Sequence, residues 1–250
     1  MLESEPPSKL QARRLAESLS EALCRQGLVV AVILVGSYAR GDFVSSSDID
    51  IVAITKRSTT SRQIRNMVPI LAANPRLSVY PYSRDIFRMR YRLGDLFIRH
   101  VIEEGEVIYD DGSYRRLLEE PFPKNSEQAL RELELVKKKL GTFELKAFNR
   151  LYLDYLAQLY ALSVQTAIAA LILAGHPEYN KRRMFKQMAR LYPKVKTESA
   201  NLERLAPFAL AATKGLHQKM PFPPVGSEKE VKASVSSLKK VIDEVESTNR

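Results

Sequence analysis

Two pairs of residues near the start of the chain have the types and spacing that phosphate and metal chemistry requires. Gly36 and Ser37 follow an apolar stretch, and Asp48 and Asp50 come about ten residues later. Gly36 has no side chain, so backbone can approach a ligand closely there. If Ser37 caps a short helix, the free N–H groups and the dipole at that helix end favour a bound phosphate. Arg40 adds a cation one turn further on.

Asp48 and Asp50 are two residues apart, so on a strand both carboxylates point to the same face. Two neighbouring carboxylates repel each other unless a cation lies between them. Hard oxygen ligands of this kind suit Mg²⁺, with water and substrate phosphates as its remaining ligands. A Gly-Ser turn or an Asp-x-Asp pair alone is more often structural than functional. Together, directly after an apolar strand, they indicate a site for phosphoryl or nucleotidyl transfer.

The elements that must position these residues follow from the hydrophobic pattern of the first half of the chain. The run LVVAVILV at 28–35 is short, β-branched and apolar throughout, which predicts a strand covered on both faces. We expect helices and strands to alternate around it, with helices at 8–26, 61–73 and 85–104 and further strands at 49–54, 77–82 and 106–109. This half is therefore predicted to be α/β.

The second half of the chain is predicted to be a bundle of four or five helices. Pro121-Phe122-Pro123 breaks the chain, so we expect one domain over residues 1–122 and another over 125–250. The pattern predicts helices at 125–141, 142–174, 179–191, 200–214 and from 227 onward, with capping boxes at Asn125/Gln128 and Ser227/Glu230. The apolar centre of the longest helix is interrupted by Gln158 and Gln165, which favours a buried bundle helix and no membrane association.

The composition excludes several classes of protein. The chain has 250 residues, of which 45% are hydrophobic and 27% charged, as in a globular protein with a real core. A single cysteine, Cys24, excludes an internal disulfide framework and a cysteine-based zinc site. The first residues contain no apolar segment of the secretory type, so we expect a cytoplasmic protein.

The net charge of +10 is unevenly distributed. Residues 1–124 carry 18 basic and 16 acidic side chains, whereas residues 125–250 carry 21 and 13. The densest basic stretch is in the second half and consists of Lys181, Arg182, Arg183, Lys186, Arg190, Lys194 and Lys196. Such a stretch is either a solvated helix face or a surface that binds a polyanion.

Residues 29–54 resemble the DNA polymerase β-like nucleotidyltransferase superfamily. The resemblance rests on Gly36 and Ser37, the interval of about ten residues, and Asp48 and Asp50 on the next strand. The minimal, aminoglycoside and lincosamide nucleotidyltransferases are most similar, and they also join such a domain to C-terminal helices. The resemblance implies an α/β (α+β) nucleotidyltransferase domain with a mixed sheet, followed by an all-α helical bundle.

The resemblance also implies a reaction. Gly36 and Ser37, with Arg40 beside them, would hold the triphosphate of an NTP, with ATP favoured. Asp48 and Asp50 would hold one or two Mg²⁺ ions. A hydroxyl of the acceptor would attack the α-phosphorus, pyrophosphate would leave, and NMP would be transferred. Positioning and charge neutralisation are the protein's main contributions to such a step.

The sequence departs from the family at the third carboxylate, which usually lies on the following strand. Strand register places Ser78 there, and a hydroxyl is a poor Mg²⁺ ligand and a poor base. We expect Asp85 to cap a helix, and Asp95 and Glu103 to be exposed helical residues. Glu144, in the helical half, is the candidate replacement and the third predicted catalytic residue.

Two functional hypotheses follow. The first is a Mg²⁺-dependent nucleotidyltransferase with a hydroxyl acceptor, for which the basic second half favours RNA or another phosphorylated molecule. The second is a nucleotide-binding regulatory or toxin–antitoxin-type module with weak or no transferase activity. The helical half lacks the Arg-x4–6-His motif of the helical partners in such systems, which disfavours a fused ribonuclease. The sequence leaves the acceptor and the oligomeric state open.

Overall fold

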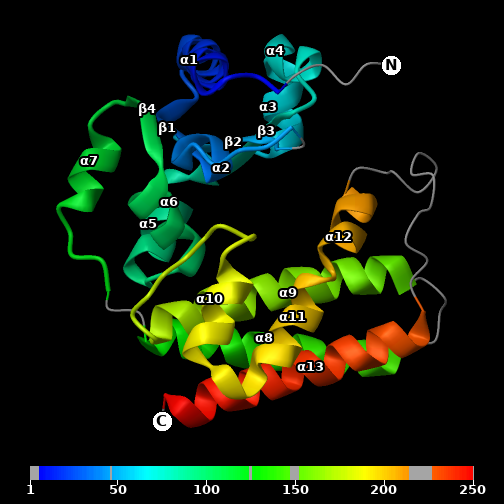
Figure 1. The fold of residues 1–250 in the computed structure, drawn as a ribbon. Helices are drawn as coiled ribbons and strands as arrows, with labels where there is room; N and C mark the ends of the chain where they lie inside the picture. The colour runs from blue at the N-terminus through cyan, green and yellow to red at the C-terminus, as the bar shows by residue number, and fades with distance from the viewer. Residues whose placement is uncertain (1–5, 46, 124–125, 147–151, 214–226, 250) are drawn as a thin grey trace. The chain divides into compact units, whose positions relative to one another are not determined.

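A computed structural model describes residues 6–45, 47–123, 126–146, 152–213 and 227–249. The side chains of residues 72, 143–146 and 213 are outside this description. The chain divides into two compact units, Met1–Lys124 and Asn125–Arg250 (Figure 1).

The first unit is built on a mixed four-stranded sheet in the order β3-β2-β1-β4. The strands are β1 (Val29–Val35), β2 (Ile49–Thr55), β3 (Leu77–Ser83) and β4 (Glu106–Asp110). β1 pairs antiparallel with both β2 and β4, whereas β2 and β3 are parallel. All seven residues of β1 are buried, which agrees with the prediction from its uninterrupted apolar run.

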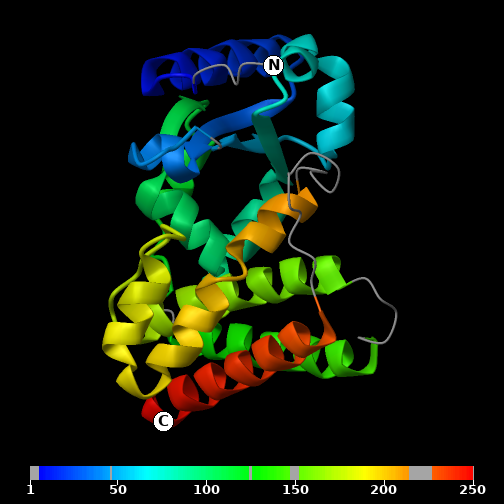
Figure 2. The ribbon, with the colours of Figure 1, turned by 45° about the vertical axis from the view of Figure 1, so that its right-hand side comes forward.

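Helices cover both faces of this sheet (Figure 2). Helices α1 (Lys9–Arg25), α3 (Ser61–Met67) and α4 (Pro69–Ala73) pack on one face, against a core that includes Leu34, Ile51 and Val79. Helices α5 (Arg84–Arg92), α6 (Leu96–Glu104) and α7 (Ser113–Leu118) pack on the other, against Ile33, Val52 and Ile54. Successive side chains of β1 and β2 point to opposite faces of the sheet and therefore contribute to two separate hydrophobic cores.

Two of the predicted helices in this unit are each broken into two. The helix expected at 61–73 ends at Met67, because Pro69 disfavours helical backbone at Val68 and starts α4. The helix expected at 85–104 is interrupted at Gly94, whose φ is +71°. Asp95 then caps α6 by accepting hydrogen bonds from two backbone N–H groups.

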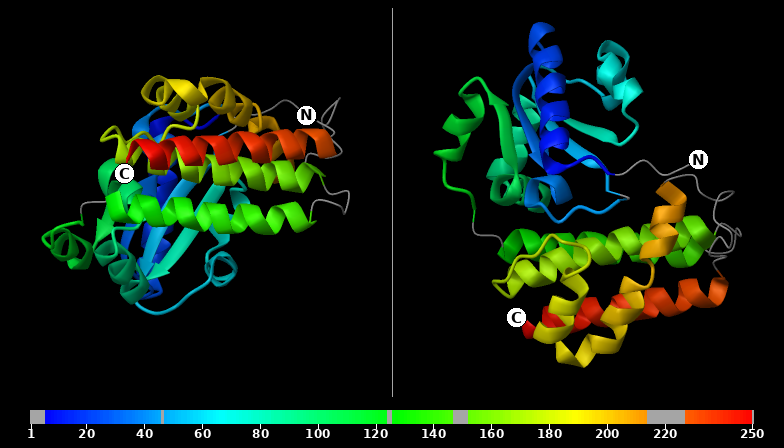
Figure 3. Two further views of the ribbon diagram at one scale, coloured as in Figure 1. Left: turned by 90° about the horizontal axis from the view of Figure 1, so that it is seen from below. Right: turned by 45° about the horizontal axis from the view of Figure 1, so that its top comes forward.

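The second unit contains six α-helices and one 3₁₀ turn within its described residues. They are α8 (Ser126–Lys146), α9 (Tyr152–Leu173), α10 (Met184–Leu191), η1 (Pro193–Val195), α11 (Lys196–Glu203), α12 (Ala206–Thr213) and α13 (Glu228–Thr248). The two additional views show α8, α9 and α13 side by side (Figure 3). The mixed sheet of the first unit and the all-helical second unit confirm the predicted fold class, an α/β (α+β) domain followed by a helical bundle.

Helix α9 is long and apolar enough to cross a bilayer by length and composition alone. Half of its residues are buried within the unit, from Leu156 to Ile172. Ser163 and Thr166 bond to backbone carbonyls one turn earlier, which satisfies their hydroxyls inside the core. These contacts are those of the central helix of a bundle.

The helix boundaries in this unit differ from those predicted. α8 continues through Gly141 to Lys146, because one glycine lowers helix stability without ending the helix. The helix predicted at 179–191 begins only at Met184, and the one predicted at 200–214 is two helices, separated after Glu203. The Ser227/Glu230 capping box is present, whereas Asn125 lies outside the described residues.

Candidate active site at the start of β2

The turn after the central strand forms the short helix α2 (Gly36–Arg40). Val35 precedes it as the N-cap and makes no side-chain cap, so the expectation that Ser37 caps this helix is wrong. Ser37 lies inside the first turn, and its carbonyl accepts hydrogen bonds from the backbone N–H groups of Gly41 and Asp42. Its hydroxyl bonds to no other residue that the structure describes, which leaves it available to a ligand.

Gly36 and Asp50 approach each other closely. Val35 and Asp50 are partners in the β1–β2 ladder, which brings the residue after Val35 beside the Asp50 carboxylate. A Cβ built on Gly36 would lie 2.9 Å from Oδ2 of Asp50, and the φ of Gly36 is +73°. Only glycine satisfies both conditions without strain. The turn and one aspartate are thus parts of one constellation.

Asp48 is exposed and ends the loop that connects α2 to β2. Arg76 holds this loop by donating from Nη1 to the carbonyl of Ser45 at 2.6 Å. The Ser47 hydroxyl accepts from the backbone N–H of Val44 at 2.9 Å, which closes a turn just before Asp48. These two hydrogen bonds hold described residues on the way to the start of β2, where Asp48 lies two residues before Asp50.

Tyr80 is a further residue at this site, and the sequence interpretation missed it. Its hydroxyl donates a hydrogen bond to Oδ1 of Asp50 over 3.3 Å. Burial, followed by the negative charge of Asp50 and that of Asp48, raises the pKa of Tyr80 to about 12. Ser78 and Tyr80 are two residues apart on β3, so their side chains lie on the same face of the sheet. Once Ser78 was placed beside Asp50, this alternation would have indicated Tyr80 as a neighbour of the site.

The structure locates the residues considered for the third carboxylate. Ser78 is the direct partner of Asp50 in the β2–β3 ladder, as strand register predicted. Asp95 is the N-cap of α6 and pairs with Arg90 at 2.8 Å, so it is not the exposed helical residue expected. Glu103 pairs with Arg99 at 2.6 Å along the helix.

The capping prediction for Asp85 is also wrong. Ser83 is the N-cap of α5, and Asp85 lies in the first turn with 89% of its side chain exposed. Glu144 is in α8, but its side chain is outside the described residues, and its proposed role stays a prediction. In the part of the chain with described side chains, no three metal-ligating residues form a cluster.

Arg40 is held by carboxylates of its own unit. Its Nε lies 3.2 Å from both carboxylate oxygens of Asp42, and its Nη1 lies 2.9 Å from Oε2 of Glu104. His100 also contacts this Glu104 oxygen, at 3.1 Å. Burial lowers the pKa of Arg40, but the two hydrogen-bonded carboxylates outweigh it and raise that pKa overall. The guanidinium, 15% exposed, therefore braces the end of α2, and its contact with a triphosphate stays a prediction.

The donor set fits a magnesium ion. Asp48 and Asp50 supply two hard carboxylate donors at the start of one strand, and the Gly36 turn keeps the space beside Asp50 free of a side chain. Mg²⁺ characteristically takes one or two protein carboxylates and completes its shell with water and substrate phosphates. Two carboxylates without a third are sufficient for such a site.

This geometry is suited to a phosphorylated ligand held beside a divalent cation, the common requirement of phosphoryl-transferring domains. A comparison with protein families identifies the domain more closely. Residues 16–137 match the family model described as a nucleotidyltransferase domain. The chain therefore carries a nucleotidyltransferase domain of the DNA polymerase β-like superfamily, and the resemblance carried by Gly36, Ser37, Asp48 and Asp50 is confirmed at the level of the family. No curated protein matches the chain significantly.

Proposed function

We propose that this protein is a Mg²⁺-dependent nucleotidyltransferase that transfers NMP from an NTP, with ATP favoured, to a hydroxyl acceptor and releases pyrophosphate. The family match supports NMP transfer in general. The proposal of Mg²⁺ and NTP rests on the close approach of Gly36 to Asp50. It places a turn suited to binding phosphate beside a carboxylate suited to binding a metal ion.

The roles of the residues follow from their positions. The backbone at Gly36 and the free hydroxyl of Ser37 would bind the triphosphate, because they lie in the first turn of α2 and carry N–H and O–H donors. Asp48 and Asp50 would hold the metal at the start of β2. When bound, Mg²⁺ supplies charge neutralisation on the phosphates and activation of the attacking oxygen. The Gly36 turn and the two aspartates would position the NTP relative to the acceptor hydroxyl.

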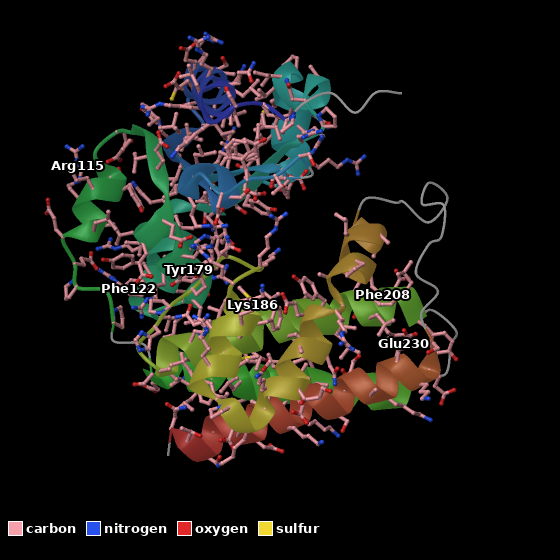
Figure 4. All side chains as sticks on the ribbon, in the orientation of Figure 1. Arg115, Phe122, Tyr179, Lys186, Phe208 and Glu230 are labelled. Atoms are coloured by element: carbon pink, nitrogen blue, oxygen red, sulfur yellow. The ribbon has the colours of Figure 1, made fainter. Side chains whose placement is uncertain are left out.

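We further propose a polyanionic acceptor, such as an RNA end or a phosphorylated molecule. In the basic stretch of the second unit, Arg183 pairs with Glu178 and Lys194 with Glu244. Lys186, which is labelled in Figure 4, and Arg190 lie one turn apart on α10. Both are exposed, and neither makes an ion pair with any described residue. Uncompensated cations at this spacing favour a ligand that carries several phosphates.

The second candidate is a nucleotide-binding regulatory or toxin–antitoxin-type module with little transferase activity. The pairing of Ser78 with Asp50 is the observation that favours it, because a hydroxyl occupies the position of a carboxylate base. Such a protein would bind Mg·NTP at the same turn and aspartates but would turn over slowly on every acceptor.

The decisive experiment is incubation of the full chain with each labelled NTP, Mg²⁺ and pooled hydroxyl acceptors, including RNA. Pyrophosphate release that disappears in Asp50→Asn supports the transferase. Asp85→Asn is the matched control, because this carboxylate is exposed and belongs to α5. Tight Mg·NTP binding with no turnover on any acceptor refutes the transferase and leaves the second candidate.

A further inference from the structure

Tyr80 presents a hydroxyl directly at the carboxylate that would hold the metal. Its Oη lies 3.3 Å from Oδ1 of Asp50, while Oδ2 of the same carboxylate faces the Gly36 turn. The Tyr80 hydroxyl is therefore next to one carboxylate oxygen of Asp50, and the Gly36 turn is next to the other. An attacking hydroxyl and a triphosphate need this kind of juxtaposition.

The strand that carries Tyr80 leaves this residue accessible. β3 is an edge strand of the sheet, and Pro81, which cannot donate to a ladder, is tolerated at such an edge. The Tyr80 side chain is 44% exposed, so its ring has room to carry a bulky substituent.

Three other tyrosines near the sheet differ in both respects. Tyr82, two residues further along the same face, accepts a hydrogen bond from Arg90 at 3.1 Å. Tyr91 donates to the carbonyl of Glu120 and is buried, and Tyr38 is fully buried. Among these four described tyrosines, Tyr80 alone combines exposure with contact to Asp50.

We propose that Tyr80 is itself an acceptor, so that the protein transfers NMP to its own Tyr80 hydroxyl. This inference rests on the proposed transferase function. In the step, Oη of Tyr80 forms a bond to the α-phosphorus of the NTP, and the bond from that phosphorus to the β-phosphate bridging oxygen breaks. Pyrophosphate leaves, and the phenol proton passes to water. The product is a phosphodiester between tyrosine and nucleoside.

The test uses the full chain with Mg²⁺ and each NTP labelled at the α-phosphate, without added acceptor. We expect up to one NMP per chain, located at Tyr80 by peptide mass spectrometry and removed by a phosphodiesterase. Tyr80→Phe should incorporate at least about tenfold less label per chain, since the nucleophile is absent. Tyr82→Phe is the matched control and should keep it, because its hydroxyl contacts Arg90 instead of Asp50.

A binding measurement separates loss of the acceptor from loss of the site. In calorimetric titrations with a non-hydrolysable NTP analogue and Mg²⁺, Tyr80→Phe should retain affinity within about threefold, whereas Asp50→Asn should lose about tenfold or more. Loss of analogue binding in Tyr80→Phe would assign Tyr80 to the nucleotide site and overturn its assignment as acceptor.

The remaining outcomes distinguish this inference from the function on which it rests. Pyrophosphate release with an added acceptor, but no label on Tyr80, overturns the inference and leaves the transferase in place. Label on Ser78 or another residue, or label that persists in Tyr80→Phe, also overturns it. Absence of both label and pyrophosphate with every NTP and acceptor overturns the proposed function together with the inference.

Discussion

Gly36 and Asp50 are packed so closely that the absence of a side chain on one determines where the carboxylate of the other can lie. The gap that a Cβ on residue 36 would leave to Oδ2 of Asp50 is 2.9 Å, shorter than real Cβ contacts. Because Val35 pairs with Asp50 across the ladder, neither partner can move away without opening β1 from β2. The β1–β2 ladder therefore keeps the turn and the Asp50 carboxylate next to each other.

The first prediction concerns this contact. Gly36→Ala should abolish most pyrophosphate release, at least about a hundredfold, because the added methyl displaces the Asp50 carboxylate. It should also lower the free energy of unfolding by about 1–3 kcal/mol, since alanine is strained at a φ of +73°. Activity assays and urea unfolding measure the two effects.

Gly27→Ala is the matched control for this prediction. The φ of Gly27 is +61°, and an added Cβ meets nothing within 4 Å. The variant should therefore show a comparable backbone strain with full activity. Equal activity losses in both variants would contradict a specific role for the contact between Gly36 and Asp50.

The second prediction concerns metal dependence. EDTA should abolish the activity. Mg·NTP at ten times its Kd should stabilise the folded wild-type chain by about 1.4 kcal/mol through mass action, which raises its melting temperature. In Asp48→Asn and Asp50→Asn this thermal shift should largely disappear. Without metal, both variants should be at least as stable as the wild type, because the repulsion between the two carboxylates is removed. A full Mg·NTP shift in Asp50→Asn would remove this residue from the metal site.

The third prediction concerns the ion pairs around Arg40. Burial raises the pKa of Glu104, but hydrogen bonds from His100 and Arg40 outweigh it, so this pKa lies below its ordinary value. The stabilisation is therefore complete above the unfolded-state pKa of about 4.3 and is lost as the pH falls through the lower folded-state value. Glu104→Gln should destabilise the protein by about 1–2 kcal/mol at neutral pH and flatten the acid limb of its stability profile.

Glu103→Gln provides the comparison for Glu104→Gln. Glu103 is the adjacent residue of α6 and pairs with Arg99 along the helix, at a more exposed position. Its replacement should change stability by about 0.5 kcal/mol or less. If the two variants have the same pH profile, the buried network is not the source of acid sensitivity.

The fourth prediction concerns a buried hydroxyl. The ring of Tyr38 stacks on Phe43 with centroids 4.3 Å apart, but its hydroxyl has no hydrogen-bond partner among the described residues. Tyr38→Phe should therefore be neutral or stabilise by up to about 1 kcal/mol, because an unsatisfied polar group leaves the core. Tyr91→Phe, by contrast, loses a hydrogen bond to the Glu120 carbonyl and should destabilise by about 1 kcal/mol. Urea unfolding of the two variants gives the comparison directly.

The parts of the fold that depend on short runs of residues were predictable. β1 is recognisable because every residue of its run is apolar, and α13 because Ser227 and Glu230 form a capping box ahead of a periodic apolar face. The helix breaks at Val68 and Gly94 were missed for the opposite reason, since helical periodicity continues on both sides of each break.

The site was predictable only as far as it is local in the sequence. Gly36, Ser37, Asp48 and Asp50 follow one another along the chain, and their spacing alone indicated a site. The contact between Tyr80 and Asp50 depends on which strands are neighbours and in which register, which no local pattern specifies. The carboxylates that hold Arg40 also come together only through the tertiary fold, since Glu104 is 64 residues away.

The position of β3 at the sheet edge has a consequence for how this domain can change. The turn at Gly36 is anchored to a central strand with a partner on each side, which is the kind of segment that opens last in hydrogen exchange. Tyr80 lies on a strand with one partner, where substitutions disturb fewer contacts. Under the proposed function, acceptor preference can therefore diverge through β3 while the nucleotide-holding turn is preserved, so that new specificities arise without loss of the fold.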